Sequence, residues 1–295
     1  MTAPADPGRR RPCRPARGLA RASTRQQACR YGAGRYPVPM PRTVTATRYV
    51  TPLREGGSMP AIVEADDDGM YVLKFRGAGQ GPRALVAELV SGEIARALGL
   101  PVPEIVFMEL DAELARTEGD PEIQALIRAS AGLNLAVDYL PGAANFDPVA
   151  ERPSATLASE IVWFDAYTSN VDRSVRNPNL LVRHGGLKLI DHGASLYFHH
   201  GWDGDTSGAG RPFTRIRDHV LLEMASGLAQ ADRTLSARLA PDRLAAIVAL
   251  VPDAWLQGPD AFGSPQQQRD AYTAYLQQRL ALPHAFVEEA ERARA

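Results

Sequence analysis

Apolar and polar residues alternate in short runs over the stretch that begins near residue 44, which is the period of β-strands. The segment "TATRYVTPLREGGSMPAIVEADDDGMYVLKFR" predicts three strands, joined by a glycine-rich turn and by a hairpin tip at "ADDDG". In "GPRALVAELVSGEIARALGL" the apolar residues recur near helical spacing, and Gly99 and Pro101 mark the predicted end of that helix. "PEIVFMEL" and "LNLAVDYLPGA" predict two more strands, on either side of a polar connection at 111–132 with room for a short helix.

The pattern turns mostly helical after the proline–glycine break of "LNLAVDYLPGA", which predicts a hinge near 134–143. Beyond it we expect a helix at 154–169, a hairpin around 180–190, and further helices near 216–230, 241–250, 266–281 and 284–293. The predicted fold class is therefore α+β with two lobes. A small lobe of antiparallel strands with one main helix is expected at 44–140, and a larger helical lobe at 141–295.

Charge is distributed unevenly along the 295 residues. Residues 1–43 hold ten arginines and a single acid, and their Arg, Pro, Gly and Ala content predicts a disordered basic tail. Two interpretations of this tail remain open: an RNA-binding or targeting arm, and a non-native extension ahead of a chain that starts at Met40. The rest of the sequence has 23 basic and 33 acidic residues, and this net charge of −10 argues against nucleic-acid binding by the folded part.

The cysteines and the hydropathy pattern bear on the compartment. Cys13 and Cys29 both fall in the tail, so the folded part is expected to lack disulfides, which favours a cytoplasmic protein. No apolar run reaches the ~18 residues of a membrane span, and we expect no membrane association.

The most unusual stretch is "SNVDRSVRNPNLLV" at 169–182, which places an acid and several carboxamides between a buried helix and a hairpin. Asp172 and Asn177 are five residues apart in a loop, which is the spacing of the acid and the metal-binding asparagine in kinase catalytic loops. Asp191 opens "DHG" directly after the strand "LKLI", as the metal-binding aspartate of kinases does. Hard oxygen ligands of this kind suit Mg²⁺, which takes its other ligands from nucleotide phosphates.

The neighbours of these residues have structural interpretations. Asn170 and Asn179 are expected to cap the helix end and brace the loop through side-chain hydrogen bonds, with Asn179 also a candidate auxiliary metal contact. Arg173 is expected to pair with a nearby acid.

Lysine is rare in this chain, which has 31 arginines but only two lysines. A lysine kept in so arginine-rich a sequence suggests a need for a compact charge. Lys74 lies in the strand "YVLKF", where alternation places it on one face with Val72 and opposite Leu73 and Phe75. It would need an anionic partner there if it is partly buried. The following helix offers Glu88 and Glu93, and we favour Glu88 because a strand lysine paired with a helix glutamate positions the phosphates of ATP in protein kinases.

The order of these motifs resembles that of the HipA-like kinases, which are relatives of the protein-kinase and phosphatidylinositol-kinase folds. The stretch from "LREGGSMP" to "ALGLPVPE" resembles the family's N-lobe, and "NVDRSVRNPNLLV" with "LKLIDHGASLYF" resembles its catalytic and metal-binding segments. The resemblance covers about residues 46–202. Two departures are Ser174, where related loops have histidine, and His192, in place of the phenylalanine of Asp-Phe-Gly.

The resemblance implies a two-lobed protein-kinase-like fold that uses ATP and Mg²⁺. Asp172 would be the catalytic base, with Lys74 on the ATP phosphates. The remaining implied contacts are a backbone cradle from Gly56, Gly57 and Ser58, Glu88 as the partner of Lys74, Asp138 and Tyr139 beside adenine, and Asn177 and Asp191 on magnesium.

The predicted function is transfer of the γ-phosphate to a hydroxyl group, with serine or threonine of an unidentified protein as the expected acceptor. Three alternatives remain open: a small-molecule phosphotransferase, a catalytically silent pseudokinase that binds nucleotide, and a structural protein that is no kinase. An antitoxin partner does not follow from the sequence.

Overall fold

The computed structural model describes residues 38–53, 59–79, 81–256, 262–282 and 284–295. Residues 1–37 of the predicted disordered tail lie outside the described residues. Among the residues from 38 onward that the structure describes, the first strand begins at Thr43, next to the predicted boundary.

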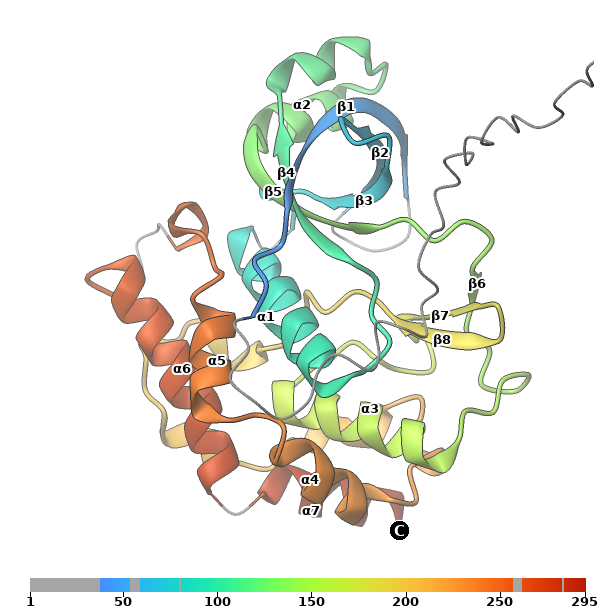
Figure 1. The fold of residues 1–295 in the computed structure, drawn as a ribbon, viewed down its shortest axis with the longest axis vertical. Coiled ribbons are helices and arrows are strands. Elements are labelled where there is room, and N and C mark those ends of the chain that lie inside the picture. The colour runs from blue at the N-terminus through green and yellow to red at the C-terminus, as the bar shows by residue number, and fades with distance from the viewer. Residues whose placement is uncertain (1–37, 54–58, 80, 257–261, 283) are drawn as a thin grey trace, which may run out of the picture. The chain divides into compact units, whose positions relative to one another are not determined.

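Five strands form a closed barrel with the order β1-β2-β3-β5-β4 (Figure 1). Their bounds are Thr43–Pro52 for β1, Ala61–Ala65 for β2, Met70–Lys74 for β3, Ile105–Leu110 for β4 and Gly132–Asp138 for β5.

The prediction of a purely antiparallel sheet is wrong in one pairing. Strand β1 is irregular along its pairing with β2, and its first three residues, Thr43 to Thr45, pair in parallel with β4. The N–H group of Phe107 on β4 donates to the carbonyl of Arg42, just ahead of β1, over 3.0 Å. A bent strand can pair with different neighbours at its two ends, and this pairing closes the barrel.

Alternation along β3 decides where Lys74 points. Successive side chains of a strand lie on opposite faces. Tyr71 and Leu73 belong to the core inside the barrel, whereas Val72 packs against a second core outside it. Lys74 therefore lies on the outer face of the barrel with Val72, as the sequence predicted.

The main helix α1, Pro82–Leu98, is buried along most of its length. It has proline in its first turn and ends at Gly99, whose φ of 81° is a left-handed conformation that glycine adopts without strain. Gly92 lets α1 approach β4 closely, because a Cβ there would lie 2.4 Å from the Cδ1 atom of Ile105. The second core joins α1 to the outer faces of β4 and β5 and to the C-terminal helices.

The remaining elements agree with most of the predicted ranges. The polar connection carries the 3-10 helix Ala112–Thr117 and α2, Pro121–Ala129. Helix α3, Ala155–Thr168, is followed by the hairpin of β7, Leu180–Arg183, and β8, Gly186–Leu189, to which β6, Ala144–Asn145, adds a third strand. Three further helices are α5, Pro241–Val248; α6, Pro265–Ala281; and α7, Ala285–Arg294. No helix in the described part of the chain is long and apolar enough to cross a bilayer.

The predicted helix at 216–230 is wrong. The segment contains two short 3-10 helices, Thr214–Asp218 and Leu222–Met224, and α4 begins only at Leu228 and runs to Ser236. The N–H group of Val220 donates to the carbonyl of Arg173, and that of Leu221 donates to Nδ1 of His219. Because these N–H groups bind other partners, the helical hydrogen-bond ladder does not form there.

Candidate active site

Asn170 holds the start of the loop that carries Asp172. Helix α3 ends at Thr168 and is capped by Ser169, which adopts a left-handed φ of 54°. Asn170 then donates from its side chain to Oδ1 of Asp165 over 2.8 Å, and its own Oδ1 accepts the N–H group of Asp172 over 3.1 Å. The prediction that Asn170 braces the loop is confirmed, whereas the residue that caps α3 is Ser169. The Asn170 side chain joins Asp165 on the helix to the residue expected to act as base.

Two carboxamides hold the half-buried carboxylate of Asp172. Nδ2 of Asn177 donates to Oδ2 of Asp172 over 2.8 Å, and Nδ2 of Asn179 donates to the Asp172 carbonyl over 2.7 Å. Burial raises the pKa of Asp172, and the hydrogen bond from Asn179 only partly opposes it. The loop thus presents a carboxylate of increased basicity in a fixed orientation.

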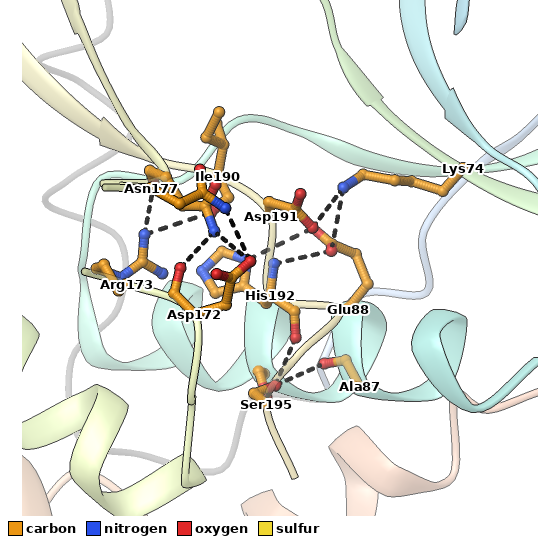
Figure 2. A network of polar contacts seen from close by, with 12 residues as sticks. Lys74, Ala87, Glu88, Asp172, Arg173, Asn177, Ile190, Asp191, His192 and Ser195 are labelled. Atoms are coloured by element: carbon orange, nitrogen blue, oxygen red, sulfur yellow. Dashed lines mark hydrogen bonds and ion pairs between the residues drawn. The ribbon is translucent and has the colours of Figure 1, made fainter. Parts of the chain in front are cut away.

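Lys74 lies between two carboxylates at the end of β3 (Figure 2). Its Nζ atom is 2.7 Å from Oδ1 of Asp191 and 3.6 Å from Oε2 of Glu88. Burial alone would lower the pKa of Lys74, but the two carboxylates outweigh burial and raise it, so the side chain is a cation at neutral pH. The rival partner, Glu93, pairs instead with Arg96 on the same helix at 3.1 Å. The preference for Glu88 is therefore confirmed.

The turn that follows Asp191 is fastened to α1. The N–H group of His192 donates to Oε2 of Glu88 over 2.8 Å, and Oγ of Ser195 donates to the His192 carbonyl over 2.6 Å. Oγ of Ser195 is also 2.6 Å from Oγ of Ser91 on α1. Asp191 has a left-handed φ of 53°, a conformation that aspartate tolerates better than most residues. Helix α1 consequently positions both carboxylates that contact Lys74.

Sequence reasoning did not identify the buried cluster of Asp165, Arg173 and His219, which supports the loop from the protein interior. The acid that pairs with Arg173 is Asp165 on α3, with Nε 2.6 Å from Oδ2, and both side chains are fully buried. Oδ2 of Asp165 is also 2.9 Å from Nε2 of His219. Since Nδ1 of His219 accepts the N–H group of Leu221, Nε2 carries the proton and donates to Asp165.

The cluster also explains why the loop and the strand before Asp191 stay together. Arg173 donates through Nη1 to the carbonyls of Asn179 and Ile190. Desolvation opposes the charged form of Asp165, but Arg173 and His219 more than offset it and hold the pKa of Asp165 well below its usual range. The signal in the sequence was an acid inside the apolar stretch "IVWFDAY", where an unpaired charge would be costly.

Some predicted nucleotide contacts stay predictions. Gly56, Gly57 and Ser58 lie outside the described residues. The N–H group of Asp138 donates to the carbonyl of Glu104, and that of Tyr139 donates to the carbonyl of Met70. An adenine contact through either N–H group would require one of these bonds to break, so other atoms of this segment are better placed for it.

The donor set fits a magnesium ion bound together with nucleotide phosphates. Asn177 and Asp191 offer hard oxygen ligands beside Asp172, with Asp191 between Lys74 and the other two in Figure 2. No group of three His, Cys, Asp or Glu side chains within the described ranges could hold a metal ion by itself. Mg²⁺ is commonly bound by one or two carboxylates plus phosphate oxygens and water, so this sparse set suits it.

Comparison with known proteins agrees with this geometry. A model of the HipA-like kinase family matches residues 47–283. The chain belongs to the HipA-like kinase family. The resemblance noted from the motifs is thereby confirmed, and the HipA-like match extends well beyond the residues that carried it.

Kinases are among the solved structures that are similar to this chain. The structure of this HipA-like kinase resembles that of the Helicobacter pylori proinflammatory kinase CtkA, with a TM-score of 0.52 and 11% identity over 85% of this chain and 99% of that one. The Golgi casein kinase gives a TM-score of 0.47 and 12% identity over 86% of this chain and 75% of that one. No curated protein sequence matches the chain. At 11% identity, the likeness to CtkA shows the fold alone.

Proposed function

We propose that this HipA-like kinase transfers the γ-phosphoryl group of ATP, with Mg²⁺, to a hydroxyl group of a serine or threonine in a protein. The observation that carries the proposal is the convergence of two sets of residues at one site. Lys74 contacts Glu88 and Asp191, the latter 117 residues away in sequence, beside the hydrogen-bonded pair of Asp172 and Asn177.

Each of these residues has a defined task in phosphoryl transfer. Asp172 accepts or orients the proton of the acceptor hydroxyl, and its raised pKa makes it a better base than an ordinary aspartate. Asn177 and Asp191 would hold Mg²⁺, which when bound supplies positive charge to the phosphate oxygens. Lys74 supplies a fixed cation, and Glu88 keeps its side chain directed into the site.

The decisive experiment incubates the purified chain with radiolabelled ATP, Mg²⁺ and candidate acceptor proteins, beside Asp172→Asn and Lys74→Ala. We expect label on the chain or on an acceptor, lost in both variants. Thermal unfolding with and without Mg–ATP is measured in parallel. Stabilisation by Mg–ATP without label would favour a nucleotide-binding scaffold or a missing small substrate, and the absence of both would overturn the proposal.

The pH dependence of transfer follows from the raised pKa of Asp172. A base must be deprotonated, so kcat/KM for the acceptor rises with pH through the pKa of Asp172 in the folded enzyme. The acidic limb of the profile should therefore lie above the ordinary aspartate pKa of 3.8. Asn179→Ala removes a hydrogen bond that lowers this pKa, and we expect the limb to move further toward neutral pH. A limb that stays in place or moves toward acid in this variant would contradict the assignment.

Two glutamates on α1 provide a matched pair of variants. Glu88→Gln removes a negative charge beside Lys74, and we expect kcat/KM for ATP to fall on the order of 10²-fold. Glu93→Gln makes the same change on the same helix, but its partner is Arg96, so kcat/KM for ATP should stay close to that of the wild type. Steady-state kinetics with varied ATP measure both. Equal effects of the two changes would show that Glu88 acts only through the stability of α1.

A further inference from the structure

Three arginines lie at the surface near the catalytic loop; we call Arg176, Arg215 and Arg217 the arginine patch. Arg176 belongs to the loop itself, is exposed, and has no hydrogen bond or ion pair among the described residues. Arg215 and Arg217 lie on the 3-10 helix Thr214–Asp218, and their side chains are 62% and 70% exposed. All three guanidinium groups are thus available to a molecule that approaches from solvent.

The backbone brings the two segments of the patch together. Ser174 and His219 form an isolated antiparallel bridge, and the N–H group of Ser174 donates to the Asn177 carbonyl over 3.0 Å, which closes the loop on itself. The bridge is a single pair, because the loop turns back after Ser174 and the residues before His219 form the 3-10 helix Thr214–Asp218. It therefore fixes the approach of the two segments at Ser174 and His219. Arg217 is two residues from His219, which limits the distance between their Cα atoms to about 7.6 Å.

The same bridge sets the distance from the patch to the reacting group. Asp172 is two residues before Ser174, and its carboxylate is hydrogen-bonded to Asn177, the neighbour of Arg176. An extended peptide covers roughly 3.3–3.6 Å per residue. A peptide whose hydroxyl group reaches Asp172 would therefore bring residues only a few positions away to the arginine patch.

The local charge at the patch opposes that of the rest of the domain. One acid, Asp218, serves both Arg215 and Arg217, at 3.8 and 3.9 Å. Three positive charges thus meet one negative charge, whereas the sequence from residue 44 onward has a net charge of −10. A local positive field on an acidic protein attracts a short anionic segment, while a long polyanion would be repelled by the surroundings.

We infer that the arginine patch binds acidic residues that flank the acceptor serine or threonine, so that the substrate is an acidic protein segment. The inference rests on the proposed function, since it takes Asp172 as the place where the acceptor hydroxyl binds. Guanidinium groups pair with carboxylates through two parallel hydrogen bonds, which gives both attraction and orientation. The same charges disfavour a cationic small molecule as acceptor.

Direct peptide binding tests this inference without relying on catalysis. Fluorescence anisotropy compares a labelled peptide with one serine flanked by glutamates and a matched peptide flanked by lysines, with Mg²⁺ and a non-hydrolysable ATP analogue present. We expect the glutamate peptide to bind at least about ten-fold more tightly, and this preference to fall as salt is raised. The double variant Arg215→Glu/Arg217→Glu should reverse the preference.

A control variant separates the patch from overall charge. Arg128→Glu/Arg233→Glu makes the same change of charge at exposed positions on α2 and α4, and the preference for the glutamate peptide should persist. Equal binding of both peptides to the wild type, or loss of preference in the control variant as well, would overturn the inference. Tighter binding of a labelled RNA oligonucleotide, lost in Arg215→Glu/Arg217→Glu, would also overturn it and assign the patch to nucleic acid.

The two proposals fail in different ways. The radiolabel experiment and stabilisation by Mg–ATP test phosphoryl transfer, and neither readout depends on an acidic flank. A chain that transfers phosphate but accepts lysine-flanked and glutamate-flanked peptides equally keeps the proposed function and loses this inference.

Discussion

Asp172→Asn should lower kcat for phosphoryl transfer by about 10³-fold and leave nucleotide binding intact. Asparagine keeps the size of the side chain and can still accept a hydrogen bond, but it cannot take a proton from the acceptor hydroxyl. The half-buried carboxylate accepts hydrogen bonds from the side chains of Asn177 and Asn179. It is not part of a salt bridge within the described residues. The substitution therefore changes the chemistry more than the fold.

The measurement is single-turnover transfer from labelled ATP, together with the shift in Tm that Mg–ATP produces. Asp242→Asn, at an exposed position in the first turn of α5, is the matched control and should retain full activity. If Asp172→Asn kept kcat within about ten-fold of the wild type, Asp172 would not be the base. If it lost the Mg–ATP shift, the residue would act mainly in binding nucleotide and metal.

Asp165→Ala should be the most destabilising of the changes considered for this chain. The substitution leaves Arg173 as a buried charge without its carboxylate partner, and breaking such a pair costs about 3–5 kcal/mol. For a chain of this size, such a loss lowers Tm by roughly 10 °C. Thermal and urea unfolding measure the loss, and Asp270→Ala, an exposed acid on α6, should change Tm little.

Acid unfolding gives a second test of Asp165. Its pKa is lowered in the folded protein, so its contribution to stability is present above the ordinary pKa of 3.8 and is lost as the pH falls through the folded pKa. The unfolding free energy of the wild type should therefore decrease more steeply with acidification than that of Asp165→Ala. Parallel curves for the two proteins would mean that Asp165 is not held as a carboxylate.

A double variant distinguishes stability from positioning. Asp165→Leu/Arg173→Met replaces the buried pair by apolar side chains of similar volume, which is often neutral or stabilising. We expect Tm to recover part of its loss, because the buried charge is removed while His219 and Asn170 still lack their carboxylate acceptor. Transfer should remain impaired, because Arg173 no longer holds the carbonyls of Asn179 and Ile190. Recovery of both Tm and full activity would show that the cluster serves stability alone.

The sequence predicted the local features of the site because they depend on short-range pattern. Alternation along β3 placed Lys74 opposite Leu73. The lysine–glutamate pair of protein kinases favoured Glu88 over Glu93 on α1, which the distances confirm. Asp172 and Asn177 are five residues apart in one loop, so their proximity could be predicted from the sequence alone. Their side chains are hydrogen-bonded in the structure. Where a helix was wrongly predicted at 216–230, the apolar periodicity was real, but the N–H groups of Val220 and Leu221 bind groups outside any helical ladder.

The sequence by itself determined most of the order of strands and helices, the strand face on which Lys74 lies, and the motifs that mark the HipA-like kinase family. Each of these follows from residues close together in the chain. Only the tertiary structure decided the closure of the barrel, the burial of Asp165 between Arg173 and His219, and the position of the arginine patch beside the catalytic loop. These contacts join segments that are far apart in sequence, and such pairings depend on how the elements pack and not on any local period.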